Sequence, residues 1–178
     1  AFIRSNILPS VVQVSCANED GGEEAFGCTG TYFLDQDGKP MVATNAHVVL
    51  GSDGKYHGCN VYFPRPSDGS FYDSVYSAGE PILYHNLRSV IDDVKVEGID
   101  YAELPLVSTA TSTSFPFPPV QKDAYKGIAK LCRAVGKDIG IGEKLYIIGY
   151  PDIGGQSITF TEGVVGGFKE SSDASITL

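Results

Sequence analysis

Hydrophobic positions in this chain fall in short runs of β-branched and aromatic residues, separated by turns rich in glycine, proline and aspartate. Such runs are typical of β-strands, whose side chains alternate between two faces. Residues 101–107, for example, place Ala102, Leu104 and Leu106 on one face. The pattern predicts an all-β fold with strands over 11–16, 28–34, 61–63, 74–76, 82–84, 101–107, 144–150, 157–161, 163–168 and 175–178.

Two consecutive segments interrupt this pattern and divide the chain. Residues 108–119 contain six serines and threonines followed by three prolines among phenylalanines, a composition that cannot form a core and predicts a linker. Residues 123–136 then show helical spacing, with Asp123 as the N-cap and Gly136 as the end. We therefore predict a first domain over 1–107, a linker over 108–122 and a second unit over 123–178.

The longest apolar run, Met41–Leu50, contains a single histidine, His47. A run of this kind predicts a buried strand, and a histidine within it needs a partner to offset its desolvation. Considered alone, the run favours a core histidine whose ring binds a backbone carbonyl. A functional histidine is the alternative, and the rest of the sequence decides between them.

Composition and charge narrow the classes of protein that fit. The 178 residues are 42% hydrophobic and 20% charged, as in a soluble globular protein. Thirteen basic against 22 acidic residues give a net charge of −9, which argues against nucleic acid or an anionic membrane surface as a partner. No apolar run approaches the roughly 18 residues of a membrane-spanning helix. No charged segment followed by an apolar run precedes the first strand, so we expect that any export signal or propeptide has been removed or lies outside this sequence.

Four cysteines fit an exported protein, either extracellular or periplasmic. Cys16 ends one predicted strand and Cys28 begins the next, so antiparallel pairing of the two strands favours a disulfide between them. Two buried free thiols are the alternative interpretation.

Three segments carry a family resemblance: the sequence around His47, the Asp100 segment with Ala102 and Leu104, and residues 141–151. With residues 9–14 and 159–168 they follow one another as in chymotrypsin-fold serine endopeptidases, and they resemble the HtrA/Deg-like branch. The resemblance implies a double β-barrel that cleaves polypeptides without cofactor or metal. It implies that His47 is the general base and that Asp100 orients its ring.

The sequence departs from this family in two places. Thr29-Gly30-Thr31 has a central glycine where relatives usually have glycines on both sides of a serine. The family's Gly-Asp-Ser-Gly-Gly nucleophile loop is absent, and Ser52, Ser70 and Ser157 lack its following glycines. We therefore expect that the nucleophile lies outside this sequence, that a C-terminal fragment or chain completes the second barrel, and that this chain alone does not hydrolyse peptides.

Alternative interpretations remain open. Asp92 and Asp93 could replace Asp100, although no apolar strand follows them directly. His57 and Cys59 with His85 or Cys132 could bind a metal, but their spacing matches no four-ligand zinc pattern. The protein could also be a non-catalytic binding or scaffold protein on a protease fold, or a viral or structural β-barrel.

Overall fold

The computed structural model describes residues 3, 7–17, 25–51, 54–65, 72–83, 100–109, 140–150, 158–167, 169–170 and 176–177. A short 3-10 helix, η2 (Leu8–Ser10), precedes the first strand, and Pro9 lies within it. The strands are β1 (Val11–Cys16), β2 (Ala25–Leu34), β3 (Pro40–Thr44), β4 (Cys59–Pro64), β5 (Tyr72–Ala78), β6 (Ile82–Leu83), β7 (Ala102–Thr109), β8 (Lys144–Gly149), β9 (Thr159–Val164), β10 (Lys169–Glu170) and β11 (Ile176–Thr177). The described residues are thus mostly β-structure, and the predicted all-β class is confirmed.

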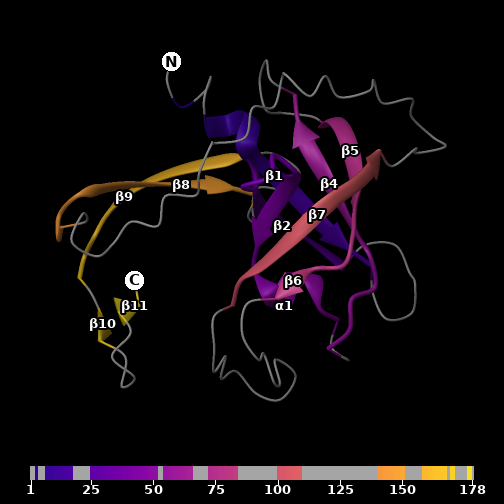
Figure 1. Ribbon diagram of the computed structural model, residues 1–178. Coiled ribbons are helices and arrows are strands. Elements are labelled where there is room, and N and C mark those ends of the chain that lie inside the picture. The colour runs from indigo at the N-terminus through magenta and orange to yellow at the C-terminus, as the bar shows by residue number, and fades with distance from the viewer. Residues whose placement is uncertain are drawn as a thin grey trace.

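The first part of the chain forms a closed antiparallel barrel (Figure 1). Its strands follow the order β3-β2-β1-β4-β5-β7, and β3 pairs with β7 to close the ring. The short strand β6 pairs with the beginning of β7. Closure leaves these six strands without the open sheet edges that other chains could pair with.

Alternate residues of each barrel strand point inward and form the core. Val12 and Val14 of β1 are fully buried, as are Val42 of β3, Val61 of β4 and Leu104 of β7. Gly30 also faces the interior, because a Cβ built on it would lie 2.6 Å from Val42 Cγ1 and 2.8 Å from Val14 Cγ2. The central glycine of Thr29-Gly30-Thr31 is therefore explained by barrel packing.

Replacing Gly30 by alanine is expected to lower the free energy of unfolding by about 1–3 kcal/mol, because the added methyl group overpacks the core. Urea unfolding of the variant measures this loss. Gly163→Ala is the matched control, since a Cβ at Gly163 in β9 has no neighbour within 4 Å. Equal stability of the two variants would contradict the inward placement of Gly30.

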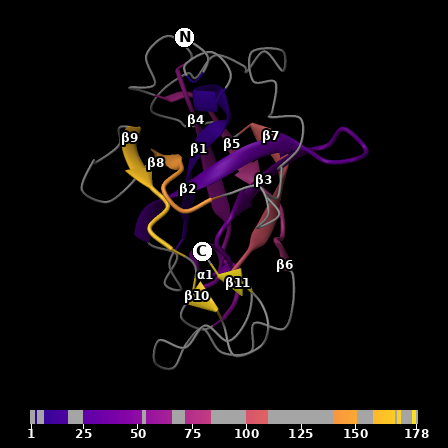
Figure 2. The same ribbon diagram turned by 90° about the vertical axis from the view of Figure 1, so that its left-hand side faces the viewer.

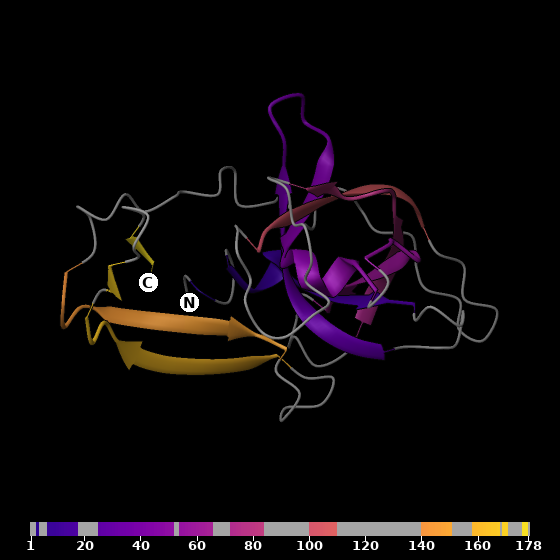
Figure 3. The same cartoon turned by 90° about the horizontal axis from the view of Figure 1, so that it is seen from below.

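The run Met41–Leu50 is not one continuous strand, contrary to prediction. β3 ends at Thr44, Asn45 is the N-cap, and residues Ala46–Val49 form a one-turn helix, α1. Helical spacing turns Ala46 and Val49 into the core, where they are 0% and 1% exposed. α1 lies at one end of the barrel, toward the viewer in Figure 3.

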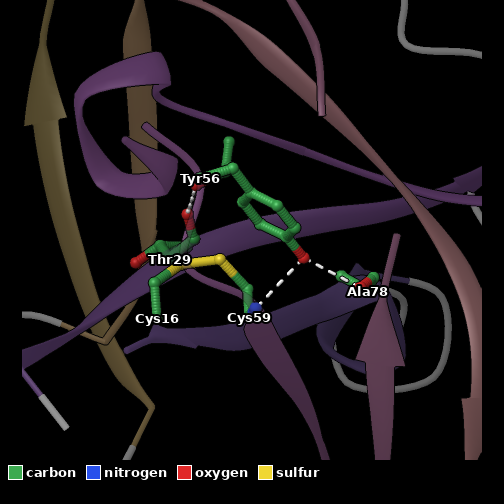
Figure 4. Close-up of a disulfide and its surroundings, with 6 residues drawn as sticks. Cys16, Thr29, Tyr56, Cys59 and Ala78 are labelled. Carbon is green, nitrogen blue, oxygen red and sulfur yellow. Dashed lines mark hydrogen bonds between the residues drawn. A yellow bond between two sulfur atoms is a disulfide. The ribbon is translucent and has the colours of Figure 1, made fainter. Parts of the chain in front are cut away.

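The barrel contains a disulfide, but the favoured pairing of Cys16 with Cys28 was wrong: Cys16 is bonded to Cys59. In the β1–β2 ladder Cys28 lies opposite Val14, whereas in the β1–β4 ladder Cys16 lies directly opposite Cys59. Figure 4 shows the bridge beside Tyr56, whose hydroxyl accepts a hydrogen bond from Cys59 N (3.1 Å) and donates one to Ala78 O (2.8 Å).

The predicted turn over 35–40 joins β2 to β3 and projects from the barrel (Figures 2 and 3). Asp35 Oδ1 accepts hydrogen bonds from the backbone amides of Asp37 and Lys39, at 2.9 and 2.8 Å. Gly38 has a φ of +78°, which glycine adopts at no steric cost. The Asp-Gly signal therefore located this turn correctly.

The last part of the chain contains an antiparallel hairpin of β8 and β9, whose β8 end meets the barrel (Figure 1). The strands predicted over 157–161 and 163–168 are replaced by the single strand β9. β7 continues to Thr109, two residues into the predicted linker. The rest of that linker and the predicted helix over 123–136 lie outside the described residues. None of the helices in the described part of the chain has the length and apolarity needed to cross a bilayer.

Candidate active site

The pairing of β3 with β7 brings His47 and Asp100 together. Thr44, the last residue of β3, lies opposite Ala102, the first residue of β7. Continuing that antiparallel register past both strand ends places Asp100 beside the start of α1. Because Ala46 and Val49 point into the core, His47 points outward on the same turn, and its side chain is 50% exposed. His47 is therefore not the buried core histidine that the apolar run alone favoured.

Two contacts join the residues of this His47–Asp100 pair. His47 Nδ1 lies 2.6 Å from Asp100 Oδ2, and the backbone N–H of His47 donates to Asp100 Oδ1 at 3.0 Å. The second contact gives one of the unpaired amides in the first turn of α1 an acceptor. The same carboxylate thus fixes both the helical turn and the ring that it carries.

Asn45 adds a third donor to the carboxylate. Its Nδ2 donates to Asp100 Oδ2 at 3.0 Å and to the backbone carbonyl of Asp100 at 3.2 Å. Partial burial raises the pKa of Asp100, but the hydrogen bonds from the His47 amide and ring, the attraction of a charged His47 ring and the Asn45 hydrogen bond outweigh it. The net effect holds the pKa of Asp100 below its ordinary value of 3.8.

This arrangement sets the proton positions in the ring. An ionised carboxylate only accepts hydrogen bonds, so Nδ1 of His47 carries the proton that Asp100 Oδ2 accepts. A neutral ring in this tautomer leaves the Nε2 lone pair free to accept a proton. The His47–Asp100 pair can therefore act chemically as an oriented base.

Because the pKa of Asp100 is lower in the folded state, its ionisation is expected to stabilise the fold at a pH above 3.8. That contribution is lost as the pH falls through the depressed folded pKa, since protonation of the carboxylate weakens the hydrogen bonds that Asp100 Oδ2 accepts from His47 and Asn45. NMR titration of the Asp100 carboxyl carbon measures its pKa in the folded state. Urea unfolding at a series of acidic pH values measures the loss of stability.

Asp100→Asn is the control for this pH dependence, because the amide does not titrate in the window. Asn45→Ala should leave Asp100 with a pKa closer to 3.8. A carboxyl that titrates at or above 3.8 in the unmodified chain would contradict the expected depression.

The structure places some of the other candidate residues and leaves others undescribed. Cys59 is consumed in the disulfide, so its sulfur cannot be a metal ligand in the combination with His57. Within the described part of the chain, no three His, Cys, Asp or Glu residues are grouped to hold a metal ion. The remaining candidates lie outside the described residues: Ser52, Ser70, His85, Asp92, Asp93, Cys132 and Ser157.

Sequence reasoning gave no role to Asn45, although it lies in the segment that carries the resemblance. Its position between the end of β3 and the start of α1 was the available signal. A side chain at that position faces the residues that precede β7, because β3 and β7 are paired.

Comparison with solved structures identifies the fold. The chain is similar to a structure described as "Structure of GrC", granzyme C, a chymotrypsin-fold protease, with a TM-score of 0.51 and 16% sequence identity. The match covers 89% of this chain and 60% of that chain, so this chain spans about 60% of the length of the solved structure. The sequence matches no protein-family model and no curated protein.

At this level of identity the similarity establishes the fold alone. The closed six-stranded barrel and the structural match together define an all-β, chymotrypsin-like fold in which this chain forms one complete barrel and part of a second.

Proposed function

We propose that this chain is part of a serine endopeptidase of the HtrA/Deg-like type, in which His47 is the general base and Asp100 orients it. The observation that carries the proposal is the contact between His47 Nδ1 and Asp100 Oδ2 at 2.6 Å, on a half-exposed ring at the end of a closed barrel. A chymotrypsin-like fold supports it, because that fold places a base where it can reach a serine hydroxyl.

In the proposed reaction, His47 Nε2 takes the proton of a serine hydroxyl as the oxygen attacks the peptide carbonyl. The ring then gives the proton to the leaving amine, and a water molecule completes hydrolysis of the acyl-enzyme by the same route. Asp100 stabilises the protonated ring while remaining ionised. The serine and its oxyanion hole belong to sequence beyond these residues in this proposal, and no cofactor is needed.

The β8–β9 hairpin supports the proposal that further strands complete a second barrel. Tyr146 and Phe160 stack on one of its faces with ring centroids 5.1 Å apart, and they remain 47% and 48% exposed. Ile147 on the opposite face is 69% exposed. Apolar side chains on both faces of a two-stranded hairpin need cover from other elements. Additional chain, continuous with this one or separate from it, would bury them.

The experiment that tests the function uses the longest gene product that contains this sequence. A fluorophosphonate probe should label a serine in the purified protein and abolish its hydrolysis of a denatured protein substrate. His47→Ala should block both labelling and hydrolysis, whereas labelling that persists unchanged would remove His47 from the mechanism. Absence of labelling in the unmodified protein would favour a non-catalytic binding protein on the same fold.

The Cys16–Cys59 disulfide is compatible with an oxidising compartment. On this basis we propose an extracellular or periplasmic location, in which the protein would encounter its polypeptide substrate outside the cytoplasm. Non-reducing mass mapping of the protein from its native source tests whether the bridge is present there.

A further inference from the structure

Thr29 on β2 lies where the β8–β9 hairpin meets the barrel. Because Gly30 faces the interior, the Thr29 side chain points outward, and its hydroxyl accepts a hydrogen bond from Tyr150 N at 2.8 Å. The two residues are 121 positions apart in the sequence. This hydrogen bond therefore joins two distant parts of the chain.

The contact between Thr29 and the hairpin is close as well as polar. A Cβ built on Gly149, the last residue of β8, would overlap the Thr29 side chain, so only glycine permits this approach. Thr159 of β9 also donates its hydroxyl to Gly149 O at 3.2 Å. Both strands of the hairpin are thereby held at the point that Thr29 contacts.

The backbone of Thr29 reaches the strand that leads to His47. The Thr29 carbonyl accepts a hydrogen bond from Thr44 Oγ1 at 3.0 Å. Thr44 is buried and directly precedes Asn45, which binds Asp100. One residue thus bonds the hairpin through its hydroxyl and the end of β3 through its carbonyl.

We propose that Thr29 is a positioning residue that fixes the β8–β9 hairpin relative to the His47–Asp100 pair. Its importance for catalysis rests on the proposed function, in which groups of a second barrel must be held in register with the base. Misplacement by about 1 Å can lower turnover about 100-fold in such sites. Without the hydroxyl, the partly buried Tyr150 amide loses its acceptor and the hairpin loses a fixed point.

The test compares Thr29→Val, which exchanges the hydroxyl for a methyl group of similar shape, with Thr29→Ser, which keeps a hydroxyl. Amide hydrogen exchange in the 178-residue chain is expected to become about 3- to 10-fold faster at Tyr150 in Thr29→Val. Thr29→Ser should keep the exchange rate of the unmodified chain. The amide of Val61 in β4 should exchange equally in all three proteins.

A second variant addresses the close contact while keeping the hydroxyl. Gly149→Ala should push β8 away from Thr29 and accelerate exchange at Tyr150 as Thr29→Val does. Unchanged exchange at Tyr150 in Thr29→Val would overturn the proposal, and so would equal acceleration at Val61, which would show general loss of barrel stability. Amide exchange does not depend on enzymatic activity. It therefore tests the contact between Thr29 and the hairpin even if the labelling experiment shows that the proposed function is wrong.

In the longer protein, Thr29→Val should lower kcat, while the midpoint of its pH profile stays unchanged and Thr29→Ser restores kcat. A residue that only stabilises the barrel would reduce the amount of folded enzyme without changing kcat per active site, which titration with the fluorophosphonate probe measures. Unchanged kcat per labelled site would remove the positioning role.

Discussion

His47→Ala in the longer protein is expected to reduce kcat by at least about 10²–10⁴-fold, the contribution typical of a positioned base. The reason is geometric: Nδ1 is engaged by Asp100 at 2.6 Å, which leaves Nε2 as the ring atom that can accept a proton. Steady-state hydrolysis of a peptide substrate, normalised to folded protein, measures the loss. Turnover that survives the substitution undiminished would remove the assignment.

His57→Ala is the matched control, because it removes a histidine that has no role in the proposed mechanism, and it should leave kcat near that of the unmodified protein. Asp100→Asn provides a second comparison, since its amide no longer requires the proton to sit on Nδ1. A similarly large loss in Asp100→Asn, with none in His57→Ala, would identify the oriented tautomer as the source of the effect.

Much of the first barrel could be predicted from the sequence, because its strands alternate and its turns carry local signals. The Asp-Gly turn and the strands before and after it are examples, since both depend on neighbouring residues only. The association of His47 with Asp100 followed from a motif resemblance, and the structure brings the two side chains together. Their catalytic roles remain a proposal.

What the sequence could not reveal depends on contacts between distant strands. The partner of Cys16 was chosen from the hairpin neighbour β2, yet β1 has a second neighbour, β4, which is not adjacent to it in the sequence. The turn α1 was missed because an apolar run has the same composition in a strand and in a buried helix. Its helical form depends on burial of Ala46 and Val49 and on the Asp100 carboxylate, all of which require the assembled barrel.

The Cys16–Cys59 disulfide is expected to provide a large part of the stability of the first barrel. The bond joins residues 43 positions apart, so it restricts a long loop of the unfolded chain. The double variant Cys16→Ala with Cys59→Ala should lower the free energy of unfolding by about 2–5 kcal/mol, measured by urea denaturation. Treatment of the unmodified chain with a reductant should lower it by a similar amount.

Cys28→Ala separates this pairing from the one that strand order in the sequence favours. Because Cys28 lies opposite Val14, its substitution leaves the Cys16–Cys59 bond intact. A reductant should therefore lower the free energy of unfolding of Cys28→Ala by the same amount as that of the unmodified chain. Non-reducing peptide mapping should recover a peptide pair that contains Cys16 and Cys59. A peptide pair that contains Cys16 and Cys28 would show that β1 is bridged to β2 instead. It would contradict the β1–β2 register, in which Cys28 lies opposite Val14.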